Sequence, residues 1–374
     1  MGWTQGSVVM EARPYAHIIC QKYAEERCNF CLKSFGNLKK CASCKNVRYC
    51  GVACQKTDWK IHKTECPIMR RVPNVPTDSI RLYLRLVLLH LGHSSSFKDH
   101  KAEAPCIRGF NDLMSHSENI KTDKKRTELF HIATDFLRAY THGVLQLPND
   151  DTLLDIFGKQ TYTHQSKVNS YFRALQYGSL LGAQILTFHK FQARPLAKYP
   201  FYRWVDWGKL GPSVLDHRCR PNAVASFNGP RVVVRAVEDI PSGRLSDVYL
   251  SYVDPMATVS ERHQQLQEQY YFSCDCNGCL NTDMEARMTS LEGSNKGDLD
   301  KAIACLQAID DMRKEQGEAS EMLSQCEDCL TNVKLPPYNV HLVRLRGKAF
   351  DLAIETEQWD AALKFGMANL KPYS

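Results

Sequence analysis

Residues 28–66 read CNFCLKSFGNLKKCASCKNVRYCGVACQKTDWKIHKTEC, and this stretch decides how the N-terminal part of the chain folds. Four close pairs of cysteine or histidine side chains follow one another in it. They are Cys28 with Cys31, Cys41 with Cys44, Cys50 with Cys54, and His62 with Cys66. Residues three or four apart can place two ligands on one metal ion, and thiolates and imidazoles bind zinc. Four such pairs therefore predict two tetrahedral zinc sites.

The order of the pairs predicts how they are shared between the two ions, because alternating pairs bind the same ion in interleaved modules. One site is then made of Cys28, Cys31, Cys50 and Cys54, and the other of Cys41, Cys44, His62 and Cys66. All four positions of each ion are filled by protein, which is typical of structural rather than catalytic zinc. A segment this short cannot build a core of its own, so the metal ions supply the missing stability.

The composition of the whole chain agrees with metal binding inside the cell. The chain has 374 residues, enough for two or more domains, and 16 cysteines without a signal-peptide pattern. A reducing compartment disfavours disulfides, so many cysteines indicate metal sites. The formal charge of +7 is only mildly basic, and it falls further when the ligating thiolates, which are deprotonated, are counted. We therefore expect weak or no direct nucleic-acid binding, and no apolar run is long enough to span a membrane.

Hydrophobic periodicity predicts strands before the zinc module and helices after it. Residues 8–10 and 16–20 are predicted to be strands that join a sheet built later in the chain. A helix is predicted over 77–91, begun by Thr77 or Asp78 and closed by Gly92. A second is predicted over 127–147, where Leu129, Ile132, Phe136, Tyr140 and Val144 lie on one stripe at helical spacing.

The character of the sequence changes after residue 210. Residues 223–227 and 231–236, joined by Asn228-Gly229, predict a β-hairpin, and 248–253 predict another strand. From residue 299 onward the pattern is helical, and 339–371 are similar to one tetratricopeptide-type helical hairpin. Cys326 and Cys329 lack a partner pair, so we interpret them as cysteines on a helix face.

Several motifs together resemble a known family. Arg48-Tyr49-Cys50 and Cys54-Gln55-Lys56 make residues 28–66 similar to the MYND zinc finger. The run from Pro212 to Asn222, the Leu250-Ser251-Tyr252-Val253-Asp254 strand end and Phe272-Ser273-Cys274-Asp275-Cys276 are similar to a SET domain and its post-SET tail. The chain thus resembles the SET and MYND domain family of protein-lysine methyltransferases.

The resemblance implies an α+β, multidomain fold: a SET-type β fold with an inserted MYND zinc finger, a helical insert, a zinc-binding post-SET tail and a C-terminal TPR-like helical domain. The implied order is 1–27 for the N-terminal part of the SET domain, 28–66 for the MYND finger, 67–190 for the helical insert, 191–255 for the SET core, 256–285 for the post-SET region and 286–374 for the TPR-like domain, which we expect to be incomplete.

The resemblance also implies a site and a reaction. A third structural zinc is expected on Cys219, Cys274, Cys276 and Cys279. The expected reaction transfers a methyl group from S-adenosylmethionine to a lysine amine, with Tyr252 as the catalytic residue. The cofactor-binding residues implied by the family positions are Asp216, His217 and Phe272.

The sequence departs from the family pattern at several positions. Gly2 and Gly6 do not reproduce the family's glycine-rich turn, so we expect the chain to begin after that strand. Asp216 replaces an asparagine, which removes an amide donor and adds a charge. Gln184 aligns loosely with a second asparagine, and the aromatic segment 199–207 is interpreted as packing on the surface rather than forming a lid.

Two hypotheses about function follow from these observations. We favour a protein-lysine N-methyltransferase that acts on histone or non-histone lysines. The alternative is a catalytically inactive scaffold that mediates protein–protein interactions in transcriptional regulation. We expect lysine-containing protein substrates, including histones, and proline-rich or other peptides bound by the MYND finger. We also expect a monomer without membrane attachment, in the cytoplasm and the nucleus.

Overall fold

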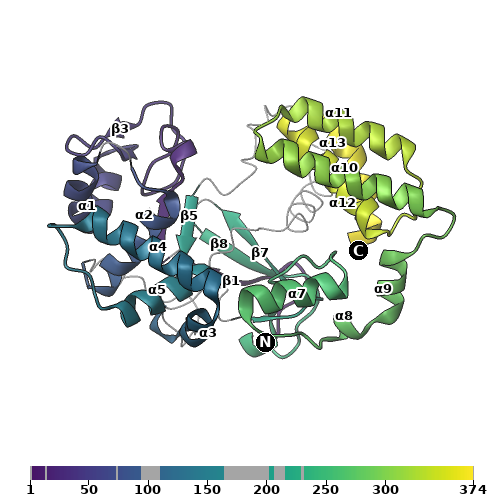
Figure 1. Cartoon of the computed structure of the whole chain (residues 1–374), viewed down its shortest axis with the longest axis horizontal. Helices are drawn as coiled ribbons and strands as arrows, with labels where there is room; N and C mark the ends of the chain where they lie inside the picture. The colour runs from purple at the N-terminus through teal and green to yellow at the C-terminus, as the bar shows by residue number, and fades with distance from the viewer. Residues whose placement is uncertain are drawn as a thin grey trace. The chain divides into compact units, whose positions relative to one another are not determined.

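The computed structural model describes residues 2–12, 15–72, 75–93, 110–163, 202–205, 215–228 and 231–373. The chain divides into two compact units, each described here by itself (Figure 1). The first contains Met1–Ser166, Pro200–Asp216 and Asn222–Leu250, and the second is built on His217–Pro221 and Ser251–Ser374. Both helices and small sheets are present, which confirms the predicted α+β class. Gln184 and most of the aromatic segment 199–207 lie outside the described residues.

Small antiparallel sheets form the β part of the first unit. Strands β1 (Val8–Ala12), β8 (Arg231–Ala236) and β7 (Ala223–Asn228) lie in the order β1-β8-β7. Strand β2 (Ala16–Ile19) pairs with β5 (Tyr202–Val205), which lies within the aromatic segment 199–207. The hairpin register pairs Ala223 with Ala236 and Asn228 with Arg231. The predicted hairpin is therefore confirmed, as is the prediction that the first two strands join later ones.

The zinc finger has little regular structure before its helix. Strands β3 (Lys39–Lys40) and β4 (Arg48–Tyr49) form a short antiparallel pair. Helix α1 (Val52–Arg71) follows and carries His62 and Cys66 on its buried side.

The predicted strand over 248–253 is shorter in the structure, where β9 covers Tyr249–Leu250. The remaining short elements are η1 (Gln21–Tyr23), η3 (Phe110–Asp112), η5 (Leu245–Asp247) and β6 (Asp216–His217).

Helix α2 (Asp78–His90) is the centre of the first unit. Every residue from Ile80 to Leu88 is buried, including Arg81 and Arg85. A helix that is apolar on nearly all sides needs neighbours on all sides. These are β2, β5, α1, α4 (Lys124–Thr141) and α5 (Asp150–Thr163), while α3 (Ser117–Thr122) packs on α4 and α5. Gly92, with φ of +76°, follows α2 as predicted.

Arg85 places a charge inside this apolar helix. Its side chain is 4% exposed, and its Nε and Nη2 donate to Glu65 at 2.7 and 2.9 Å. Its Nη1 donates to the carbonyl oxygen of His17 at 2.8 Å, and Nη2 lies 3.4 Å from both carboxylate oxygens of Asp58. Burial raises the pKa of Glu65, but the charge of Arg85 holds it well below its usual range. The buried guanidinium therefore joins β2, α1 and α2 through charged hydrogen bonds.

The apolar stripe identified in the helix predicted over 127–147 lies mostly at the surface, and the helix is shorter than predicted. The helix, α4, ends at Thr141, and Leu129, Ile132 and Phe136 are 51%, 47% and 61% exposed. Val144 lies beyond the helix and is also exposed, so only Tyr140 of the predicted stripe is buried. The buried residues of α4 are Phe130, Thr134, Leu137, Tyr140 and Thr141. The helix carries two apolar stripes, and periodicity cannot tell which of them meets the core.

The second unit is helical. Helices α7 (Val259–Tyr270), α8 (Asn277–Leu280) and α9 (Thr282–Thr289) precede four longer helices (Figure 1). The longer helices are α10 (Lys296–Lys314), α11 (Ala319–Asn332), α12 (Val340–Glu355) and α13 (Trp359–Tyr373). Their core contains Cys326, Phe350, Ala362 and Phe365. The predicted helical hairpin over 339–371 corresponds to α12 and α13, and Cys326 and Cys329 lie on α11 as predicted.

The first turn of α7 is tied to α12. Thr258 and Glu261 form a capping box, in which each side chain bonds the other residue's backbone N–H. Arg344 of α12 donates to both carboxylate oxygens of Glu261, at 2.9 and 2.7 Å. Arg344 and two donors at the start of the helix thus share one carboxylate. Burial raises the pKa of Glu261, but these partners lower it to about 2.

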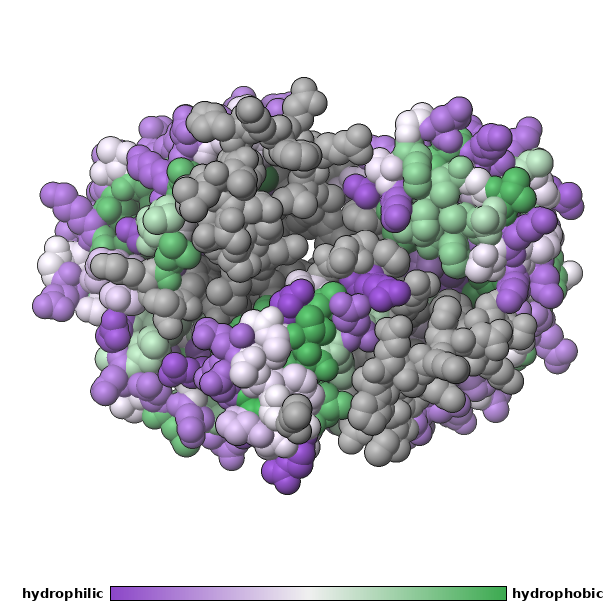
Figure 2. Space-filling model, turned by 180° about the vertical axis from the view of Figure 1, so that it is seen from behind, coloured by the Kyte–Doolittle hydropathy of each residue, from purple (hydrophilic) through white to green (hydrophobic). Residues whose placement is uncertain are grey.

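Apolar side chains also remain at the surface. On the face shown in Figure 2 they lie in separate patches among polar residues. No helix within the described residues is both long enough and apolar enough to cross a membrane.

Replacing Arg85 by methionine is expected to destabilise the first unit by about 3–5 kcal/mol, because it leaves the buried carboxylates of Glu65 and Asp58 without their cation. Arg138→Met is the matched control, since Arg138 pairs with Asp135 and Asp150 at the surface and its loss should cost under about 1 kcal/mol. Denaturant unfolding, combined with hydrogen exchange of α1, α2 and β2, measures both. Equal effects of the two substitutions would contradict the prediction.

Candidate functional site

Three groups of metal-binding side chains occur among the described residues. In each group the four ligand atoms lie within 4.8 Å of one another. The groups are Cys28, Cys31, Cys50 and Cys54; Cys41, Cys44, His62 and Cys66; and Cys219, Cys274, Cys276 and Cys279. The structure thus brings the twelve ligands predicted from the sequence together in the three predicted sets.

The spacing of the donor atoms fits zinc. Zinc–sulfur bonds of about 2.3 Å in a tetrahedron place sulfur atoms about 3.8 Å apart. The Sγ atoms of Cys31 and Cys50, and those of Cys41 and Cys66, are 3.8 Å apart. Disulfide sulfur atoms would be about 2.05 Å apart, and these cysteines are free. Three compact four-ligand sets, two of which include sulfur pairs at the tetrahedral spacing, indicate three structural zinc sites.

The second finger site has an ordered outer shell. His62 Nε2 lies 3.5 Å from Cys44 Sγ, and its Nδ1 lies 3.4 Å from Glu65 Oε2. A carboxylate on the far nitrogen of a histidine ligand fixes which nitrogen faces the metal. Burial raises the pKa of Cys41, but the backbone of Cys44 and the side chain of His62 bring it to about 6. Glu65 is the same residue that binds Arg85, so this zinc site is joined to the core of the first unit.

The third zinc site lies entirely in the second unit. Cys219 precedes the other three ligands by more than fifty residues, and its Sγ is 3.3 Å from Cys279 Sγ. Gly278 fits closely here, because a Cβ at this position would lie 3.2 Å from Arg220 Cβ. The guanidinium of Arg262, buried in α7, donates to the carbonyl oxygens of Ala257 and Gly278 and lies 4.0 Å from Cys279 Sγ. A cation beside a four-thiolate site offsets part of its negative charge.

An aromatic cluster packs against this zinc site. The centroid of the Tyr252 ring lies 5.2 Å from the ring centroid of His217, 5.1 Å from that of Tyr270 and 6.5 Å from that of Phe272. Phe272 also lies 5.8 Å from His217. Tyr252, Tyr270 and Phe272 pack on Cys219 and Cys274 in one hydrophobic cluster. Three of the residues predicted from family positions, His217, Tyr252 and Phe272, are therefore neighbours, while the side chain of Asp216 is exposed at the preceding position in β6.

The backbone explains how these aromatic side chains meet. Helix α7 ends at Tyr270, and Tyr271 takes the left-handed conformation with φ of 58°. This conformation turns the chain after the helix, so that Phe272 returns towards Tyr252. On the other side of the cluster, the buried hydroxyl of Ser251 donates to the carbonyl oxygen of Val253 at 2.7 Å. Tyr252 is held between these two bonded neighbours.

Two residues of this region were missed by the sequence analysis. Tyr270 ends a polar helix, and burial raises its pKa to about 12. Asn222 clamps the segment before β9: its amide donates to Asp247 O at 2.8 Å, and its carbonyl oxygen accepts from Tyr249 N at 2.7 Å. A helical terminus and an asparagine after a proline carry no spacing signal, so only the fold reveals these roles.

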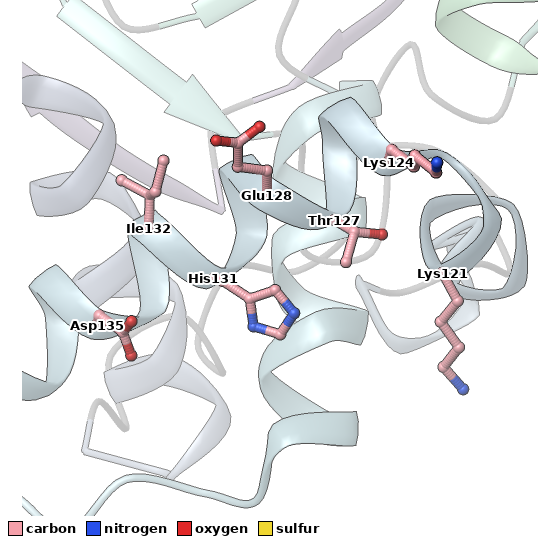
Figure 3. A pocket seen from close by; sticks show the side chains of 7 residues that line it. All are labelled: Lys121, Lys124, Thr127, Glu128, His131, Ile132 and Asp135. Atoms are coloured by element: carbon pink, nitrogen blue, oxygen red, sulfur yellow. The ribbon is translucent and has the colours of Figure 1, made fainter.

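A separate concave patch lies along one face of α4 and the end of α3 (Figure 3). It encloses about 410 Å³ and mixes both charges. Its lining residues are Lys121, Lys124, Thr127, Glu128, His131, Ile132 and Asp135. It contains none of the predicted site residues, so the chemistry of the protein is better sought at the aromatic cluster.

The fold and the site define a zinc-binding α+β protein with a MYND finger and a second, four-cysteine zinc region beside an aromatic cluster. Residues 28–66 match the MYND finger family. The chain is 26% identical over 373 residues to "Histone-lysine N-methyltransferase SMYD3" of Homo sapiens, covering 98% of this chain and 78% of that protein. It is 26% identical over 382 residues to "N-lysine methyltransferase SMYD2" of Homo sapiens, covering 99% and 79%.

The similarity extends over the whole chain, and "N-lysine methyltransferase SMYD2-A" of Xenopus laevis, 24% identical over 380 residues, agrees with it. Over nearly its whole length the chain is similar to proteins of the SET and MYND domain family, which confirms the resemblance seen in its motifs. At the level of the family, its similarity is to protein-lysine methyltransferases.

The purified chain should contain three zinc ions, and Cys219→Ser should contain two. Serine is a poor zinc ligand, and the third site shares no ligand with the finger, so the finger should keep both ions. Inductively coupled plasma mass spectrometry counts the metal. Cys329→Ser, which removes a thiol outside the three sets, is the control and should retain three. Loss of zinc from the finger in Cys219→Ser would show that the ligand sets are assigned incorrectly.

Proposed function

We propose that the chain is an S-adenosylmethionine-dependent protein-lysine N-methyltransferase that acts on lysine side chains of histones or other proteins. The observation that supports this most is the cluster of Tyr252, Tyr270, Phe272 and His217 on the third zinc site. It combines phenol hydroxyls with apolar ring faces, which a lysine chain and a sulfonium cofactor both require.

The residues at this place fit the cofactor. Phe272 and Tyr252 are only partly buried, so aromatic faces remain for an adenine ring or a cationic sulfur. Asp216, His217 and Phe272 would hold the cofactor. When bound, S-adenosylmethionine supplies a methyl group activated by its positively charged sulfur.

The acceptor lysine must lose its proton before it can attack. At pH 7 this costs about 4.6 kcal/mol for a free lysine, whose pKa is about 10.4. An apolar aromatic surrounding disfavours the ammonium form and offsets part of this cost. The phenol of Tyr270 is protonated at pH 7, as an ordinary tyrosine is, and burial raises its pKa further to about 12; it therefore adds no negative charge that would stabilise the ammonium.

Tyr252 orients the reacting groups. Its ring is fixed by contacts with His217, Tyr270 and Phe272, so its hydroxyl has a defined direction. A fixed hydroxyl can accept from, or donate to, the amine as it approaches the methyl group, and such positioning lowers the barrier. No other proton acceptor is needed if the lysine enters neutral.

We also propose that the MYND finger binds proline-rich or other peptides, and that the protein acts in both cytoplasm and nucleus. Exposed Phe35, Val52 and Trp59 on the finger support a peptide-binding surface.

The alternative function is an inactive SET and MYND scaffold. It is favoured by the acidic side chain of Asp216, which stands in place of an amide.

Tyr252→Phe should lower the turnover number at least about tenfold while the melting temperature stays nearly unchanged, because the ring keeps its packing and only the orienting hydroxyl is lost. The assay uses labelled cofactor with histone and cytosolic proteins as substrates. Tyr249→Phe, three residues earlier at β9, is the matched control and should retain activity. Absence of methyl transfer by the wild-type chain, with partner binding retained, would favour the scaffold.

Asp216→Asn should tighten cofactor binding by about tenfold, since an amide restores a donor and removes an anion near the cofactor's carboxylate; one hydrogen bond to a charged group contributes about 1–3 kcal/mol. Titration calorimetry with S-adenosylmethionine measures the change. Asp239→Asn, another exposed aspartate, is the control and should leave the Kd unaltered. Equal or weaker binding by Asp216→Asn would show that Asp216 does not face the cofactor.

A further inference from the structure

The two ring nitrogens of His217 have different partners. Nδ1 lies 3.0 Å from the backbone nitrogen of Tyr252, and Nε2 lies 3.3 Å from Cys219 Sγ. A backbone N–H can only donate, so Nδ1 must be the unprotonated acceptor. The proton of the neutral ring is then on Nε2, where it faces the sulfur.

The same direction of the second bond would be required with zinc bound at the third site. A cysteine bound to zinc is a thiolate and has no proton to donate, so Nε2–H is the donor to Cys219. The backbone of Tyr252 therefore connects through one imidazole ring to a ligand of the third zinc ion. Outer-shell partners of a metal site usually orient a metal ligand. Here the ligand Cys219 orients the imidazole of His217, and that imidazole holds the backbone of Tyr252.

We propose that His217 is a positioning residue that holds the backbone of Tyr252 in place through its bond to the Cys219 thiolate. This inference rests on the proposed function for its catalytic consequence, but its geometry does not. The Ser251 hydroxyl on the Val253 carbonyl supplies a second bond to the same segment. With both bonds present, the Tyr252 hydroxyl keeps one direction relative to Phe272 and Tyr270, and the third zinc site becomes part of the catalytic geometry.

Two substitutions separate the two bonds of His217. In His217→Asn the side-chain oxygen can take the place of Nδ1, but the chain is too short to reach the sulfur. In His217→Gln the amide nitrogen can take the place of Nε2, but the acceptor that Nδ1 gives to the Tyr252 N–H is lost. His263→Asn is the matched control. His263 also bonds a zinc ligand, through the carbonyl oxygen of Cys274 at 2.8 Å, but Tyr252 N donates to His217 and not to His263.

The first measurement does not need activity. Long-range proton–nitrogen correlation spectra of the zinc-loaded, nitrogen-15-labelled chain should show His217 as the neutral Nε2–H tautomer. The amide of Tyr252 should exchange slowly with deuterium in the wild type, in His217→Asn and in His263→Asn, and at least about tenfold faster in His217→Gln, which lacks the acceptor. The Nδ1–H tautomer, or equal exchange in His217→Gln and the wild type, would overturn the proposal.

The second measurement is kinetic. His217→Gln should lower kcat at least about tenfold with little change in the KM of the protein substrate, because the alignment of Tyr252 is lost. His217→Asn, which keeps an acceptor for the Tyr252 N–H, should lose less of kcat than His217→Gln and should release the third zinc ion faster to a chelator. Full turnover by His217→Gln would overturn the proposal. If the wild-type chain transfers no methyl group, the proposed function fails, while the tautomer and the Tyr252 exchange still decide whether His217 positions that segment.

Discussion

The buried guanidinium of Arg85 is the interaction on which the first unit depends. An isolated charge at this depth would be strongly unfavourable, so its acceptors must stay in place for the unit to remain folded. They come from Glu65 and Asp58 in α1 and from the carbonyl of His17 in β2. Burial and the charge of Arg85 lower the pKa of His17 to about 4, so this ring stays neutral and its Nε2–H donates to the carbonyl oxygen of Asn29 at 3.0 Å. One cation thus fixes the rotation of α2, the docking of α1 and the entry of the chain into the finger.

In two short segments of the chain, the predicted zinc sites connect the segment to the rest of its unit. Both zinc-bearing segments are short and polar, and each becomes part of a larger unit through the outer shell of its metal site. In the finger, Glu65 connects the ligand His62 to Arg85. In the second unit, the thiolate of Cys219 faces the imidazole of His217, and Arg262 lies beside Cys279. The two regions use opposite arrangements: a histidine ligand held by a carboxylate in one, and a cysteine ligand that accepts from a histidine in the other.

The sequence predicted those parts of the structure whose residues lie close together along the chain. The four pairs in the finger, the hairpin around Asn228 and the helices α12 and α13 were all accessible, because their signals lie within a few residues. The buried face of α4 was not, since Leu129 and Phe130 begin two stripes that both contain apolar residues, and only the neighbouring helices decide between them. The roles of Arg85, Asn222 and Tyr270 also depend on partners distant in sequence. The link between Cys219 and the later cysteines came only from family resemblance, because a single cysteine fifty residues away has no spacing of its own.

The C-terminal helices are part of the site region within the second unit. Helix α7 carries Leu266 in the cluster with Cys219 and Tyr252, and Tyr270 at its end contacts Tyr252. Its other end is held by Arg344 of α12 on Glu261 and by Glu285 of α9, whose carboxylate accepts from the backbone N–H of Val259 at 3.1 Å. A helix fixed at its first turn and packed along its length has little freedom at its last residue. The position of Tyr270 beside Tyr252 therefore depends on contacts made by Glu285 of α9 and Arg344 of α12, in helices that carry none of the reacting groups.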